Sequence, residues 1–118
     1  MTPQAAQTSQ DSSAEIGLSA YKGLFLEEAA TFLTTLRESL ARLVRDPEDG
    51  SARDEAHRAA HTLKGMASTM RYESLAAIAT RLESTFAPGS HLTRDQIDLL
   101  LAGCDEFEAG LERLKGEG

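Results

Sequence analysis

The sequence lacks several features that define common classes of protein. It has a single cysteine, Cys104, which excludes an internal disulfide framework and favours a reducing compartment. No run of about 18 apolar residues is present, so we expect no membrane-spanning helix. The first residues carry neither a basic patch nor an apolar core, so we expect no secretory signal peptide and a cytoplasmic location. Alternating strand patterns and internal repeats are also absent, which leaves helices as the expected structure.

Positive charge is also scarce, and it is unevenly distributed. The net charge is −7, which argues against nucleic-acid binding because the phosphates would repel the chain. Residues 53–83 carry five basic and four acidic side chains, whereas residues 1–52 carry four and eight and residues 84–118 carry three and seven. A site that must take up negative charge is therefore better placed in the central segment than elsewhere.

Apolar residues recur at three- and four-residue spacing in four segments, and each pattern predicts an amphipathic helix. A turn containing Pro47 and Gly50 separates the first two helices, and residues 87–90 form a second turn. Thr93 and Gln96 have the spacing of a capping box at the start of the last helix. Short connections between four helices predict an all-α, up-down four-helix bundle. The expected helices span residues 20–44, 52–70, 73–86 and 94–114.

The N-terminal segment differs in composition from the rest of the chain. Residues 1–17 are rich in Gln, Ser, Thr and Ala with almost no large apolar residue, which predicts a disordered tail. The bundle is then expected to span residues 18–115. Residues 116–118 resemble the start of a linker, so the chain is either a complete small protein or the first piece of a longer one.

The central helix presents one unusual polar face. At about 100° per residue, Leu63 lies among alanines and methionines on the inward face, and His61 lies about 160° away on the solvent side. Gly65 falls beside His61 one turn later. A glycine inside a helix costs roughly 1 kcal/mol relative to alanine, and this one sits where nothing needs packing. We therefore predict that another molecule must come close to the imidazole of His61.

The segment His61-Thr62-Leu63-Lys64-Gly65 resembles the H-x-[LI]-K-G signature of histidine phosphotransfer domains. The longer run from Ala60 to Met70 is especially similar to the phosphoacceptor domains of CheA-type chemotaxis kinases. The likeness continues through Leu82-Glu83 and, more weakly, from Tyr21 to about Leu114. The resemblance implies that His61 is the phosphoacceptor and attacks through Nε2. It also implies that Nδ1–H donates to a carboxylate of the next helix, a position matched here by Glu83.

Residues close to His61 on the same helix have further expected roles. Lys64 is expected to stabilise the phosphoryl group, and Gly65 to give a partner access. His57 and Ser68 complete the expected docking face. The chain holds no nucleotide-binding sequence, so ATP and Mg²⁺ are expected on partner domains. These partners are a histidine kinase catalytic domain and a response-regulator receiver domain.

Two positions depart from the family pattern. Thr80 stands where CheA-type domains often carry a second histidine, which removes a supporting hydrogen bond from the expected site. Arg71 follows the central helix where a glycine is usual, so we expect the turn either to differ in shape or to present an extra cation to a partner.

Other functions are also compatible with the sequence. Within the same class, the chain could be a stand-alone phosphorelay shuttle loaded by a receiver aspartate. A helical interaction module without phosphate chemistry would leave His61, Lys64 and Glu83 as ordinary surface residues. His57 and His61 are spaced to share a metal ion, but no third histidine or thiolate lies nearby, so we expect no metal site. Cys104 falls in the apolar stripe of the last helix and is expected to be a buried, inert thiol.

Overall fold

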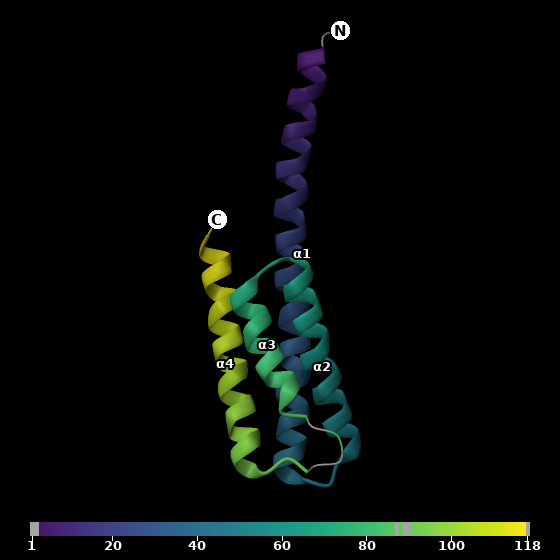
Figure 1. The fold of residues 1–118 in the computed structure, drawn as a ribbon, viewed down its shortest axis with the longest axis vertical. Coiled ribbons are helices and arrows are strands. Elements are labelled where there is room, and N and C mark those ends of the chain that lie inside the picture. The colour runs from purple at the N-terminus through teal and green to yellow at the C-terminus, as the bar shows by residue number, and fades with distance from the viewer. Residues whose placement is uncertain (1–2, 87, 89–90, 118) are drawn as a thin grey trace.

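The four amphipathic segments form four antiparallel helices in the computed structural model, which describes residues 3–86, 88 and 91–117 (Figure 1). Successive helices run in opposite directions, and α1 packs against α2 and α4 while α3 packs against the same two helices. The all-α, up-down bundle is confirmed. The helices are α1 (Pro3–Arg45), α2 (Gly50–Thr69), α3 (Glu73–Ser84) and α4 (Arg94–Gly116).

Helix α1 begins earlier than the sequence predicts. The expected start is Ala20, whereas the backbone is helical from Pro3. Figure 1 shows this N-terminal part projecting past the ends of the other three helices. The described core begins only at Phe25. The predicted tail thus lies outside the bundle, and its described backbone continues α1.

The other helix ends depend on local capping. Asp49 caps α2, its side chain accepting the N–H of Ala52 at 2.9 Å, so α2 starts two residues before its expected first residue. The predicted capping box of Thr93 and Gln96 is confirmed, with both reciprocal hydrogen bonds present. Helix α3 ends at Ser84, so Phe86 lies beyond it rather than within it.

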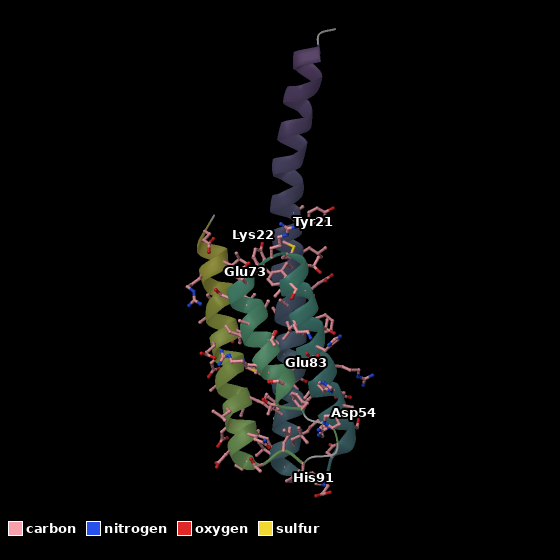
Figure 2. All side chains as sticks on the ribbon, viewed as in Figure 1. Tyr21, Lys22, Asp54, Glu73, Glu83 and His91 are labelled. Carbon is pink, nitrogen blue, oxygen red and sulfur yellow. The ribbon has the colours of Figure 1, made fainter. Side chains whose placement is uncertain are left out.

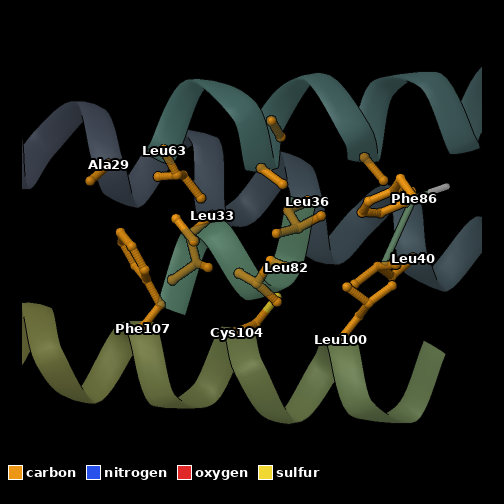
Figure 3. Close-up of a cluster of buried hydrophobic side chains, with 14 of the residues drawn as sticks. Ala29, Leu33, Leu36, Leu40, Leu63, Leu82, Phe86, Leu100, Cys104 and Phe107 are labelled. Atoms are coloured by element: carbon orange, nitrogen blue, oxygen red, sulfur yellow. The ribbon is translucent and has the colours of Figure 1, made fainter. Parts of the chain in front are cut away.

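The inward faces meet in one continuous apolar core. Figure 3 shows Leu36 of α1, Leu82 of α3 and Cys104 of α4 converging between the helices. Each large aliphatic side chain buried here contributes roughly 1.5–3 kcal/mol. Most of the predicted inward residues are buried, and those at the edges of the apolar stripes are only half-buried. The half-buried residues include Phe32, Met66, Met70, Ile78, Leu101 and Leu114.

Helix α4 approaches α3 closely at two buried glycines. A Cβ at Gly103 would lie 2.5 Å from Cδ2 of Leu82, and one at Gly110 would lie 2.5 Å from Cδ2 of Leu75. The missing side chains leave room for these two leucines against the backbone of α4. Glycine is therefore favoured at these positions by packing and not by backbone conformation, because a Cβ would force the end of each leucine side chain to shift.

A polar cluster joins α1 to the start of α2. Arg42 of α1 donates to Glu55 at 2.6 Å and lies 3.4 Å from a carboxylate oxygen of Asp49. Ser39, which is almost fully buried, donates to the same Glu55 oxygen at 3.4 Å. The cluster fixes α2 along the length of α1. It was not anticipated from the sequence, because the turn between the two helices decides which of their charged residues meet.

The turn between α2 and α3 has the shape of a glycine-capped helix end. Arg71 adopts the left-handed conformation with φ of 61°. Its N–H donates to the carbonyl of Ser68 at 3.0 Å, and that of Tyr72 donates to Ala67 at 2.9 Å. This pair of bonds is the Schellman motif, which usually carries glycine in place of Arg71. The departure from the family pattern therefore leaves the turn intact and places strain on one residue.

Replacing Arg71 with glycine should stabilise the protein. The left-handed conformation costs an L-residue about 1–2 kcal/mol, partly offset by the larger chain entropy of glycine in the unfolded state. We expect Arg71→Gly to raise the free energy of unfolding by about 0.5–1 kcal/mol, measured by chemical denaturation. Arg71→Ala keeps the strained Cβ and should match the wild type. Equal stabilities of the two variants would contradict this account.

Candidate functional site

His61 stands in solvent on the middle turns of α2. Its side chain is 68% exposed, while its neighbours Ala60 and Leu63 are completely buried. The helical spacing that directs Leu63 into the core directs His61 away from it. The expected orientation of α2 is confirmed, and a ring nitrogen of His61 is accessible to an approaching molecule.

Glu83 of α3 reaches across to the site and contacts two residues of α2. One carboxylate oxygen, Oε2, lies against Nδ1 of His61, and the other, Oε1, accepts from Nζ of Lys64 at 2.6 Å. Glu83 is only 19% exposed. Figure 2 places it where α3 faces α2, well away from both ends of the bundle. The contact expected from the sequence between Glu83 and Nδ1 is therefore present.

The charge state of Glu83 fixes the tautomer of His61. The Lys64 ammonium and then the His61 ring lower the pKa of the Glu83 carboxyl below its ordinary value of 4.5, against the effect of partial burial. At neutral pH this carboxylate is ionised and can only accept hydrogen bonds. Nδ1 must therefore carry the proton of the neutral ring, which leaves the lone pair on Nε2, on the ring edge opposite Glu83.

Lys64 is oriented differently from the sequence-based expectation. We predicted that it would reach a phosphoryl group on His61, but in the structure its ammonium binds Glu83, and its side chain is one-third exposed. Lys64 thus holds the carboxylate that holds the imidazole. A direct role toward a phosphoryl group stays a prediction.

Gly65 is free of neighbours, as the sequence predicts. A Cβ built on it would meet no atom within 4 Å, so neither packing nor backbone strain accounts for the glycine. It borders an apolar groove of about 400 Å³ between α1 and α2. Tyr21 and Leu24 line this groove and are 63% and 50% exposed. Figure 2 shows Tyr21 where α1 leaves the bundle.

Comparison with known proteins identifies the family. The Hpt domain profile matches residues 20–117. The chain belongs to the Hpt domain family. It is 33% identical over 101 residues to the chemotaxis protein CheA of Bacillus subtilis and 31% over 102 residues to that of Halobacterium salinarum. These alignments cover 82% and 83% of this chain but only 15% of each relative.

Solved structures agree with this assignment. The CheA phosphotransferase domain from Thermotoga maritima is 34% identical with a TM-score of 0.76, over 80% of this chain and 94% of that one. A solution structure of the histidine phosphotransfer domain of CheA is 35% identical with a TM-score of 0.77, over 84% and 77% of the two chains. This CheA-type membership supports a part in phosphotransfer within two-component signalling. None of the four helices, over the residues described, has both the length and the apolar character needed to span a bilayer.

His57 occupies a different environment from the exposed position we expected. Its ring is half-buried and stacks on Phe86, with centroids 5.3 Å apart and planes 18° apart. The pattern of α2 alone does not indicate this contact, because Phe86 comes from the segment after α3. His57 and His61 thus contact different partners. Within the described residues of the Hpt domain, no three His, Cys, Asp or Glu side chains are grouped to hold a metal ion.

The remaining predicted residues lie apart from the His61–Glu83 contact. Ser68 is exposed on α2, and its docking role stays a prediction. The Thr80 hydroxyl donates to the Ala76 carbonyl of its own helix at 2.8 Å, so it gives Glu83 no support. Cys104 is fully buried, and burial raises the pKa of its thiol to about 11, which makes it a poor nucleophile.

The pKa of Glu83 predicts a pH-dependent contribution to stability. Because the folded pKa lies below the unfolded one, the contribution is present above about pH 4.5 and lost as pH falls through the folded value. We expect the stability gap between wild type and Glu83→Gln to narrow as pH falls from about 7 to about 3. Chemical denaturation at several pH values measures this difference in the free energy of unfolding. Lys64→Gln should reduce the pH dependence, and a gap independent of pH would contradict the assignment.

Proposed function

We propose that His61 accepts a phosphoryl group from a separate ATP-binding histidine kinase domain and passes it to an aspartate of a response-regulator receiver domain. One observation carries this proposal: an exposed imidazole has its Nδ1 held by an ionised carboxylate and its Nε2 free. A nucleophile oriented by a fixed third group is the arrangement used in covalent group transfer. Because ATP is the phosphoryl source, we place the domain in the cytoplasm.

The proposed chemistry at His61 uses the imidazole itself and the carboxylate of Glu83. The Nε2 lone pair attacks the γ-phosphorus, the bond from that phosphorus to the bridging oxygen breaks, and ADP leaves. The proton stays on Nδ1, and the negative Glu83 stabilises the resulting imidazolium. In the second step a receiver carboxylate oxygen attacks the phosphorus, the P–N bond breaks, and neutral His61 is restored. ATP and Mg²⁺ are held by the partner domains in both steps.

The kinase domain is proposed to belong to the same longer protein. The chain spans about 15% of the length of the CheA relatives it matches, which have room for a kinase domain elsewhere. A stand-alone phosphorelay shuttle would use His61 in the same way but would be loaded by a receiver aspartate. Similarity to CheA over more than four-fifths of this chain favours the first arrangement.

Phosphorylation of His61 can be tested with labelled ATP and a CheA-type kinase catalytic domain. We expect acid-labile, base-stable label on the wild type and none on His61→Gln. Glu83→Ala should slow labelling by roughly tenfold or more, the effect of losing about 1.4 kcal/mol of transition-state stabilisation. Helical content by circular dichroism should be unchanged.

Glu106→Ala provides the matched control, because Glu106 is an exposed carboxylate on α4 that pairs with Arg81. It should be labelled at the wild-type rate. If Glu83→Ala were also labelled at that rate, Glu83 would have no positioning role. If the wild type took no label from a kinase domain or from a phosphorylated receiver, the chain would be a helical interaction module instead.

Substitutions at Gly65 should raise the stability of the protein but slow phosphorylation of His61 when the new side chain is large. Gly65→Ala fills empty space in an exposed helix interior and should raise the free energy of unfolding by about 0.8–1 kcal/mol. Gly65→Leu should also keep the helix but slow labelling of His61, because its side chain stands beside the imidazole. Denaturation and initial labelling rates measure the two effects.

Gly103→Ala is the control for the stability of Gly65→Ala. Its Cβ would meet Leu82 at 2.5 Å, so the same gain in helix propensity should be cancelled or reversed. If alanine stabilised the protein at both positions, the free space around the added Cβ would not explain the effect on stability. An unchanged labelling rate in Gly65→Leu would refute partner access as the reason for the glycine.

A further inference from the structure

The two sides of His61 along α2 are not equivalent. On the side facing α3, Lys64 is bound to Glu83 and His57 is stacked on Phe86. The side facing α1 holds Gly65, whose missing side chain leaves open space, and Arg58, one turn before His61. The α3 side is therefore occupied by contacts within the domain, and the α1 side is open.

Arg58 is an exposed cation on α2. It borders a groove of about 310 Å³ with Phe32 of α1 and Glu55 of its own helix. Glu55 is already bound by Arg42 at 2.6 Å and by Ser39. Within the described part of the chain, Arg58 forms no ion pair or hydrogen bond through its side chain. Its guanidinium is therefore available to an external anion.

Helix geometry brings Arg58 within reach of the reactive nitrogen. Residues three apart on a helix have Cβ atoms about 5–6 Å apart, and arginine has a long, flexible stem. Lys64 has the same three-residue spacing on the other side of His61, but its ammonium is held by Glu83. A phosphoryl group on Nε2, turned away from Glu83, thus has Arg58 as its nearby uncommitted cation.

We propose that Arg58 contacts the phosphoryl group on phosphorylated His61. This inference rests on the proposed function and assigns Lys64 and Arg58 different tasks. Lys64 holds Glu83, whereas Arg58 donates guanidinium N–H bonds to phosphoryl oxygens, which match its planar fork. A cation in this position favours the dianionic phosphoryl group over the monoanion. The contact is solvent-exposed, so its effect is modest.

The test uses phosphoramidate, a small phosphoryl donor that needs no kinase. Nε2 attacks the phosphorus, a new P–N bond forms, the donor's P–N bond breaks, and the protonated donor nitrogen leaves as ammonia. After removal of excess donor, the ³¹P chemical shift of the phosphorylated domain is followed against pH to give the phosphoryl pKa. The variants are Arg58→Gln, Arg58→Lys and Arg113→Gln, the last removing one exposed positive charge from the distant end of α4.

We expect Arg58→Gln to raise the phosphoryl pKa by about 0.2–0.7 unit, the range of an exposed ion pair. Arg58→Lys should recover part of this shift, because lysine keeps the charge but not the fork. Arg113→Gln should match the wild type. A pKa in Arg58→Gln equal to that of Arg113→Gln would overturn the assignment of Arg58.

This experiment separates the two proposals. A normal ³¹P signal that His61→Gln abolishes, with no shift in Arg58→Gln, refutes the role of Arg58 and leaves the proposed function standing. Absence of any ³¹P signal that depends on His61 would count against both. A merely structural role for Arg58 would lower the thermal stability of Arg58→Gln without moving the phosphoryl pKa.

Discussion

The site depends on one carboxylate that serves two partners. Glu83 accepts from Lys64 with one oxygen and from Nδ1 of His61 with the other. The first contact keeps Glu83 ionised, and an ionised carboxylate allows the ring proton only on Nδ1. The lone pair is thus placed on Nε2 by a contact at the opposite edge of the ring. The imidazole of His61 can then be exposed to solvent and still be held in one orientation.

The bundle supports this contact by using adjacent residues for different purposes. Leu82 is buried between α3 and α4, and the next residue, Glu83, faces α2. In the same way Leu63 is buried and Lys64 reaches the site. The core and the site therefore share the same turns of α2 and α3. Packing that fixes the two leucines also fixes the separation of the polar groups beside them.

Local signals predicted the helices, the Thr93 cap and the exposure of His61, because periodicity and capping act within a few residues. Contacts between distant segments were harder to predict. The stacking of His57 depends on where the chain leaves α3, and the orientation of Lys64 depends on competition between partners in space. Glu83 was located only through the resemblance to a family, since nothing in its own helix distinguishes it from a solvated carboxylate.

The cluster around Glu55 has a consequence for how the domain can vary. Arg42 and Ser39 hold Glu55 from α1, and Asp49 caps the same end of α2. A slip of α2 by one residue would rotate its faces by about 100° and carry the imidazole toward the core. These polar contacts oppose such a slip, since it would strand the carboxylate away from its donors. Insertions in the loop between α1 and α2 should thus be tolerated only where they bulge outward and leave α2 with the same face toward the core.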